Sequence, residues 1–142
     1  MIEIRRSAIV RYSDAQMFAL VNDIEAYPRR FAWCAGAQVL QREPGALTAC
    51  LELRFGGMST QFTTRNTLDP PRRIDMQLVE GQFRQLSGGW EFVALGGGCK
   101  VVLALDFDYA GTLLAPVVRS GFQKLADRMV DEFCRAAERD YG

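Results

Sequence analysis

The sequence predicts an α+β fold in which a curved antiparallel sheet of six to seven strands wraps around one long C-terminal helix, with two short helices after the first strand. Two observations carry this prediction. Apolar and polar residues alternate with a period of two through most of residues 37–109, which is typical of strands with one buried face. After Gly111-Thr112 the apolar spacing changes to three and four residues, which is typical of an amphipathic helix. The chain of 142 residues shows no linker and no internal repeat, so we expect a single domain over residues 1–142.

The N-terminal region predicts a strand followed by two short helical segments. Residues 2–12 alternate apolar side chains with charged ones such as Glu3 and Arg5, which indicates a half-buried strand. Ser13-Asp14 then supplies an N-cap for a helix that ends near Asn22-Asp23. The apolar side of this helix consists of Met17, Phe18, Leu20 and Val21. Tyr27-Pro28 starts a second short helical turn or loop.

Turn residues divide the period-two region into short strands. Gly56-Gly57, Pro70-Pro71 and Gly96-Gly97-Gly98 mark turns, and a Gly-punctuated stretch follows Leu78 before the alternation resumes at Trp90. Between the first two of these turns, Thr64 and Asn66 share a face with the apolar residues Phe62 and Leu68. We therefore expect both polar side chains to point inward, toward a water or toward a carbonyl or hydroxyl of a ligand.

The C-terminal helix is expected to have about six or seven turns, with Pro116 near its first turn. Its apolar stripe consists of Val118, Phe122, Leu125, Met129, Phe133 and Ala136. A strongly twisted sheet wraps a helix imperfectly. Two interpretations of the stripe therefore remain: it fills the core, or part of it faces a cavity that holds an apolar ligand.

The composition excludes several classes of function. The chain has no histidine, so it holds no Ser-His-Asp or Cys-His catalytic unit and no HExxH zinc site. Lys plus Arg and Asp plus Glu each number 17, which argues against a broad charge-driven nucleic-acid surface, and we expect no DNA partner. There is no apolar run of membrane-spanning length and no secretory signal at the start. We expect a cytoplasmic protein without a membrane span, whose contact with membranes is transient at most.

The remaining candidate reactive groups each have a simpler interpretation. Gly96-Gly97-Gly98 joins two strands and opens no helix, so it is not expected to bind phosphate. Asp106 and Asp108 share one strand face and would suit acid-base work or a divalent ion, but ordinary solvation is the favoured interpretation. The four cysteines form no C-x-x-C pair, and we expect them to be buried and reduced; no metal or cofactor is expected. The arginines are either solvated charges or one patch for RNA or an acidic partner; the candidates are Arg5, Arg6, Arg11, Arg29, Arg30, Arg72 and Arg73.

Several short motifs distributed over nearly the whole chain form one combined pattern. They are Tyr12-Ser13, Met17-Phe18, Leu20-Val21, Asp23-Ile24, Tyr27-Pro28, Phe62-Thr63-Thr64-Arg65-Asn66, Leu78-Val79-Glu80-Gly81, Phe83, Leu86, Gly88, Trp90-Glu91-Phe92, Phe122, Leu125-Ala126, Met129-Val130, Phe133 and Ala136. Together they resemble the START-like polyketide cyclase/coenzyme Q-binding family, and in particular a bacterial branch of ribosome association toxins. The chain departs from the family pattern at Arg30-Phe31-Ala32, ahead of Trp33-Cys34, and at Gly81-Gln82-Phe83. Both departures lie in loops that would border a cavity mouth.

The resemblance implies a helix-grip fold with a hydrophobic cavity and, in the coenzyme Q-binding members, ubiquinone as a ligand rather than a cofactor. An isoprenoid tail is expected along Leu105, Phe107, Val118, Phe122, Leu125 and Met129. The headgroup is expected near Trp90, Asn66 or Tyr27, and the expected ligand-binding set is completed by Phe31, Trp33 and Phe62. Because no catalytic residue set is implied, non-enzymatic ubiquinone binding in support of cellular respiration is the leading interpretation.

Two other functions stay open from the sequence. The toxin branch implies binding to the large ribosomal subunit and inhibition of translation, which would need an exposed arginine surface and would weaken as salt rises. An enzyme of the cyclase or dehydratase kind would need acid, base or arginine groups that face inward. The candidates for that role are Arg6, Arg65 and Tyr109.

Overall fold

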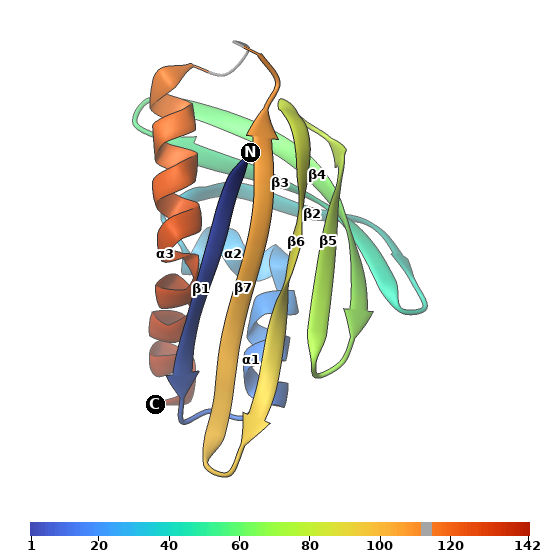
Figure 1. The fold of residues 1–142 in the computed structure, drawn as a ribbon, viewed down its shortest axis with the longest axis vertical. Helices are drawn as coiled ribbons and strands as arrows, with labels where there is room; N and C mark the ends of the chain where they lie inside the picture. The colour runs from blue at the N-terminus through green and yellow to red at the C-terminus, as the bar shows by residue number, and fades with distance from the viewer. Residues whose placement is uncertain (112–114) are drawn as a thin grey trace.

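The computed structural model describes residues 1–111 and 115–142 and contains a seven-stranded antiparallel sheet with the order β1-β7-β6-β5-β4-β3-β2. The strands from β2 to β7 therefore form a meander, and β1 pairs with β7 at one edge. The strands are β1 (Ile2–Val10), β2 (Cys34–Glu43), β3 (Ala46–Phe55), β4 (Met58–Asp69), β5 (Arg73–Glu80), β6 (Phe83–Leu95) and β7 (Gly98–Tyr109). Figure 1 shows the sheet curving around the helices, as the α+β prediction of a helix-grip fold requires.

The two α-helices that follow β1 begin at the residues that the sequence predicts, whereas a short 3-10 helix between them was not predicted. Helix α1 (Asp14–Asn22) follows Ser13, whose hydroxyl accepts from the Gln16 amide at 3.1 Å while the Gln16 side chain accepts from the Ser13 amide at 2.9 Å. This reciprocal capping box satisfies two backbone donors that the first helical turn leaves free. The 3-10 helix η1 (Ile24–Ala26) and helix α2 (Tyr27–Arg30) follow directly.

Helix α3 (Pro116–Tyr141) closes the concave side of the sheet and lies beside β1 in Figure 1. Its 26 residues give about seven turns, and Pro116 stands in the first turn, where a missing backbone N–H is not costly. The sequence predicts that the apolar spacing changes from strand-like to helix-like after Gly111-Thr112. Thr112 lies outside the described residues. No helix in the described ranges is both long and apolar enough to cross a membrane.

The Gly-punctuated stretch after Leu78 contains one turn, at Gly81, but its later glycines lie within a strand. Only Gly81 and Gln82 separate β5 from β6, and β6 then runs without a break through Gly88 and Gly89. Gly88 and Gly89 serve the close approach of neighbouring backbones instead of a turn. A Cβ added at Gly88 would lie 2.1 Å from the Ala104 carbonyl oxygen on β7.

The core lies between the inner face of the sheet and the apolar stripe of α3. Val118, Phe122, Leu125 and Phe133 of the stripe are buried, while Met129 is half-buried. Phe122, Leu125 and Phe133 belong to one hydrophobic core cluster with inward-facing side chains of the strands, for example Ile4 on β1 and Leu103 on β7, and Met129 packs against it. The helix thus fills most of the concave side of the sheet, and the space that it leaves is the site described next.

Candidate ligand-binding cavity

A cavity of about 100 Å³ lies between the inner face of the sheet and α3. Its wall is formed by the inner faces of β3 to β7, by one side of α3, and by Ile24, Tyr27 and Trp33 from the segments that follow α1. Among the residues that the structure describes, no side chain that lines the cavity is charged. A charged ligand would therefore lose its hydration without gaining a countercharge, so the wall favours a neutral, largely apolar molecule.

The structure brings most of the predicted ligand-binding residues together around this cavity. Nine of the twelve line it: Tyr27, Trp33, Phe62, Asn66, Trp90, Leu105, Phe122, Leu125 and Met129. The other three support the wall from behind. The Phe31 ring stacks on Trp33 with centroids 4.7 Å apart, the Phe107 ring lies 4.9 Å from Phe122, and Val118 is buried one turn before Phe122. Contact of these residues with a ligand stays a prediction.

Other lining residues were not singled out as ligand-binding in the sequence. They are Ile24, Ala49, Leu51, Leu53, Met76, Leu86, Leu103, Ala126 and Phe133. Thr64, which the sequence already predicts to face a water or a ligand, completes the lining. Alternation along β3, β5 and β7 could have found Ala49, Leu51, Leu53, Met76 and Leu103, because every second residue of these strands faces inward. Ile24 gives no such signal, since its 3-10 helix of three residues is too short to show a period.

The polar end of the cavity is formed by Thr64 and Asn66 on β4. Both are buried, as predicted, and the Thr64 hydroxyl donates to the Asn66 side-chain oxygen at 2.8 Å. A third polar lining group, the Tyr27 hydroxyl, donates to the Val21 carbonyl oxygen. Burial raises the pKa of Tyr27 above its ordinary value, so this phenol stays protonated.

Aromatic rings close the end of the cavity near α2. Tyr27 packs edge-on against Phe31, Trp33 and Phe133, and Trp90 packs edge-on against Phe133. The Trp33 indole N–H donates to Glu132 on α3 at 2.7 Å. This bond ties the segment between α2 and β2 to α3 across the end of the cavity.

The three residues considered for cyclase or dehydratase chemistry do not meet in the cavity. Arg65 is exposed and lies 3.2 Å from Glu43, Arg6 pairs with Asp127 of α3, and the Tyr109 hydroxyl donates to the Arg119 carbonyl oxygen at 2.9 Å. None of the three lines the cavity wall. Their nomination as one inward-facing catalytic set is therefore wrong, because the strand register turns Arg65 to the side of β4 opposite Thr64 and Asn66.

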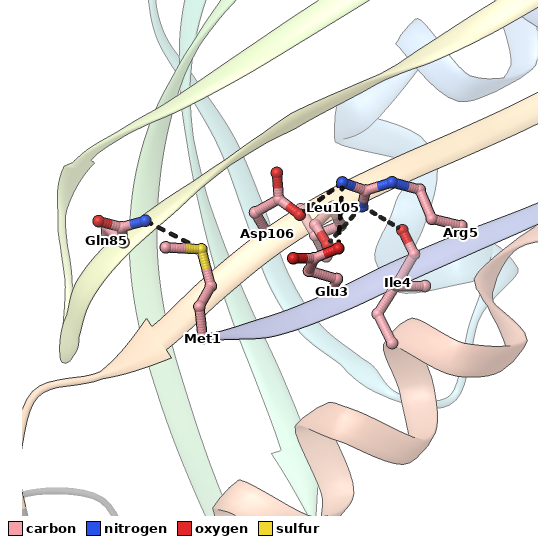
Figure 2. A network of polar contacts seen from close by, with 7 residues as sticks. All are labelled: Met1, Glu3, Ile4, Arg5, Gln85, Leu105 and Asp106. Carbon is pink, nitrogen blue, oxygen red and sulfur yellow. Dashed lines mark hydrogen bonds and ion pairs between the residues drawn. The ribbon is translucent and has the colours of Figure 1, made fainter.

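The paired carboxylates of β7 lie in surface ion pairs. Figure 2 shows Asp106 and Glu3 beside Arg5 of β1. The Arg5 guanidinium lies 2.8 Å from the Asp106 carboxylate and 3.8 Å from that of Glu3. Arg5 also donates to the Ile4 carbonyl oxygen at 2.8 Å, while Asp108 lies 3.7 Å from Arg84. Within the part of the chain that the structure describes, no cluster of three acidic or cysteine side chains is arranged to hold a metal ion. The solvated interpretation of Asp106 and Asp108 fits this geometry.

The candidate arginines do not present a single free patch. Of the seven candidates, five form ion pairs with carboxylates: Arg5, Arg6, Arg30, Arg72 and Arg73. Arg11 lies over the Tyr12 ring and donates to the C-terminal Gly142 carbonyl oxygen. Much of the positive charge is therefore neutralised by neighbouring carboxylates.

All four cysteines are free, and two of them depart from the predicted burial. Cys34 and Cys99 are buried, whereas Cys50 and Cys134 are half-buried because they lie on strand and helix positions that the core does not cover completely. Burial raises the pKa of Cys99 to about 11 and also raises the pKa values of Cys34 and Cys134. Thiols that stay protonated are poor nucleophiles, so none of these three is poised for covalent chemistry at neutral pH.

The chain is similar over most of its length to a described protein family and to named bacterial proteins. Residues 10–134 match the family described as polyketide cyclase/dehydrase and lipid transport. The chain is 43% identical over 140 residues to the ribosome association toxin RatA of Pseudomonas aeruginosa, covering 98% of this chain and 97% of that protein. It is 39% identical over 142 residues to the RatA of Escherichia coli K12, covering 99% of this chain and 90% of that protein.

Solved structures show the same fold. The ZhuI aromatase/cyclase of a Streptomyces species superposes with a TM-score of 0.83 at 20% identity and covers 99% of this chain and 96% of its own. A START superfamily protein from Mycobacterium smegmatis superposes with a TM-score of 0.68 at 24% identity, and the match covers 96% of this chain and 94% of that protein. At these identities the likeness concerns the architecture alone.

Proposed function

The chain belongs to the polyketide cyclase/dehydrase and lipid transport family, and we propose that it binds a neutral lipophilic molecule, ubiquinone, in the cavity beneath α3. The observation that carries the proposal is an apolar wall without a charged side chain and with a Thr64–Asn66 pair at one end. Such a wall suits an apolar tail and a small polar ring. In this proposal the protein holds the ligand without converting it, in the cytoplasm and in support of respiration.

Binding requires the cavity to expand. A volume of about 100 Å³ is below the roughly 300–1,000 Å³ of typical ligand sites, so lining side chains must move when the ligand enters. Met76 and Met129 suit this role, because both line the cavity, both are half-buried, and methionine adapts readily to new packing. Burial of the ligand's apolar surface supplies roughly 25 cal/mol per Å² to offset the rearrangement.

The proposal is tested by organic extraction and mass spectrometry of the freshly purified protein. We expect a quinone to co-purify with the wild-type chain and to be lost in Met129→Asp, which places a carboxylate in the apolar wall. Gln123→Asp is the matched control, because Gln123 is exposed on the same helix and does not line the cavity. A folded Met129→Asp variant that binds decylubiquinone as tightly as Gln123→Asp would overturn this placement of the ligand.

We propose as a second function that the protein associates with the large ribosomal subunit and inhibits translation. The supporting observation is the near full-length likeness, at 43% and 39% identity, to two proteins named ribosome association toxins. The two functions are compatible, because the first uses the interior of the molecule and the second its surface.

Co-sedimentation with purified large subunits at increasing salt tests the second function. An arginine-phosphate interface would release counterions, so binding would fall steeply between about 50 and 200 mM salt. Because five candidate arginines are already ion-paired, we expect a shallower decline than a free basic patch would give. No co-sedimentation at low salt would contradict the proposal.

A further inference from the structure

We infer that one side of α3 is the surface that contacts the ribosome, and that this surface binds phosphates of ribosomal RNA. The inference rests on the second proposed function, association with the large ribosomal subunit, and adds where on the molecule and by what chemistry the contact is made. We name this surface the α3 basic stripe. It consists of Lys124, Arg128, Arg135 and Arg139, and none of these is among the seven arginines considered from the sequence.

The period of the α-helix brings the four cations of the stripe together. At about 100° per residue, their side chains leave the helix within an arc of about 60°. They follow one another at intervals of four, seven and four residues, so the stripe extends for about 22 Å along α3. All four residues are exposed.

Three carboxylates of α3 lie along a separate line of the helix. Asp127, Asp131 and Glu138 leave the helix within an arc of about 40°, beside the stripe and toward β1. Asp127 fixes this orientation, because it pairs with Arg6 of β1. The exposed face of α3 is thus divided lengthwise into an acidic edge and a basic stripe, and Asp131 is the member of the acidic edge that lies closest to the stripe.

The cations of the stripe keep most of their charge available to a partner. Among the residues that the structure describes, Lys124 and Arg128 form no ion pair. Arg139 donates to a backbone carbonyl oxygen of α2 at 3.3 Å, a neutral acceptor that leaves its charge uncompensated. Arg135 does have a carboxylate partner, since it lies 2.8 Å from Glu132.

The stability of the helix does not account for the stripe. Lys124 and Arg128 are like charges four residues apart, as are Arg135 and Arg139, and this arrangement destabilises a helix. The helix dipole favours cations in the last turn, but Lys124 and Arg128 lie in the middle of α3, where that effect has faded. A partner with repeated negative charge would supply the missing compensation.

The chemistry of the stripe favours RNA over an acidic protein. Three of its four cations are arginines, whose planar guanidinium matches a phosphate group. Between Lys124 and Arg139, a range that the structure describes completely, the arc of the stripe contains no apolar or aromatic side chain. Interfaces between proteins depend on buried aromatic or aliphatic anchors, whereas interfaces with nucleic acids are more polar and more positively charged.

The test measures co-sedimentation with purified large ribosomal subunits between about 50 and 200 mM KCl. Four phosphate contacts predict that the logarithm of the association constant falls against the logarithm of the salt concentration with a slope of about −3. Lys124→Gln should make this slope shallower by about one and weaken binding about fivefold near 100 mM KCl. Glutamine is a good helix former, so this variant should stay folded.

Lys100→Gln is the matched control. It removes the same charge from the same type of residue, but Lys100 is exposed on β7, on the face of the sheet that points away from α3. Its slope and affinity should equal those of the wild type. Asp131→Asn should change binding in the opposite direction, because it removes a negative charge beside the stripe. We expect it to tighten binding about twofold, a gain that damage to the fold would not produce.

The same titrations with ribosomal RNA extracted from the large subunit identify the class of partner. We expect Lys124→Gln to bind this RNA more weakly than Lys100→Gln does. A loss that appears on whole subunits but not on extracted RNA would assign the stripe to an acidic ribosomal protein and overturn the inference. Equal binding of subunits by Lys124→Gln and Lys100→Gln would also overturn it, while association with the ribosome would stand. Failure of the wild-type protein to sediment with subunits at low salt would contradict the proposed function itself.

Discussion

Gly88 shows how a single residue permits the sheet to curve past its neighbour. Its φ of +150° lies in a region that residues with a side chain rarely adopt. An added Cβ would lie 2.1 Å from the Ala104 carbonyl oxygen and 2.8 Å from the Leu105 Cα. Both atoms belong to the backbone of β7, so neither can move without disturbing the β6–β7 hydrogen bonds.

Gly88→Ala should therefore lower the free energy of unfolding by about 2 kcal/mol or more, since backbone strain and a backbone clash both act at this position. Urea unfolding measures the change. Gly96→Ala is the control, because nothing lies within 4 Å of a Cβ at that turn, and it should change stability by no more than about 0.5 kcal/mol. Equal effects of the two substitutions would show that the close approach is not costly.

At the scale of elements, residues 31–34 act as a strap that ties α2 and β2 to α3. The Arg54 amide donates to the Trp33 carbonyl oxygen at 2.9 Å, and Phe31 stacks on the Trp33 ring. On the other side, Glu132 accepts from Trp33 at 2.7 Å and lies 2.8 Å from Arg135. Because Trp33 also lines the cavity, the strap and α3 together close that end of it.

Glu132→Ala should loosen the strap. A hydrogen bond to a charged group contributes about 1.5–3 kcal/mol, so we expect a loss near the lower end of that range in the free energy of unfolding. The Trp33 indole should become wetter, which shifts tryptophan emission to longer wavelength. Arg135→Ala serves as the control, since it removes only the exposed partner of Glu132 and should leave the emission unchanged. Unchanged emission in Glu132→Ala would mean that packing alone holds the strap.

Much of the element layout could be predicted because its causes are local. The Ser13 cap, the alternation of β7 and the stripe of α3 each depend on residues within a few positions of one another. The continuity of β6 could not be predicted, because Gly88 is needed for the close approach to Ala104, which lies on the neighbouring strand. The outward position of Arg65 follows from the same alternation that turned Thr64 and Asn66 inward, and the sequence interpretation missed it by allowing Arg65 an inward role.

Long-range pairing limited the prediction of the site in the same way. The residues around the cavity were found mostly through their apolar character on inward faces, and nine of the twelve do line it. The arrangement of Asn66 and Trp90 across β5 depends on two strand registers that no local pattern specifies. The pairing of Trp33 with Glu132 likewise joins residues 99 positions apart.

For the whole molecule, the ionisable groups whose pKa folding shifts are thiols, phenols and the Arg73 guanidinium, whose pKa the hydrogen bond to Asp75 raises. The chain has no histidine, so no imidazole titrates near neutral pH. Burial raises the pKa of Cys99 from its ordinary value of 9.0 to about 11, and it raises the pKa values of Tyr109 and Tyr141 above their ordinary value of 10.0. The dependence of stability on pH should accordingly appear on the alkaline side.

The free energy of unfolding should decrease as pH rises from about 9 to about 11. Below pH 9 both the folded and the unfolded chain keep the Cys99 proton, so the full stability is present. Between pH 9 and 11 the unfolded chain releases this proton while the folded chain retains it, so rising pH favours unfolding. Urea unfolding at intervals across this range measures the change. The free energy of unfolding should decline less steeply with pH in Cys99→Ala than in the wild type. The smaller side chain lowers stability by the same amount at every pH, so it does not affect this slope. Cys50→Ala, at a half-buried position, should keep the wild-type slope. If Cys99→Ala also kept that slope, the alkaline loss would have to come from the other thiols with raised pKa values, Cys34 and Cys134, or from the phenols.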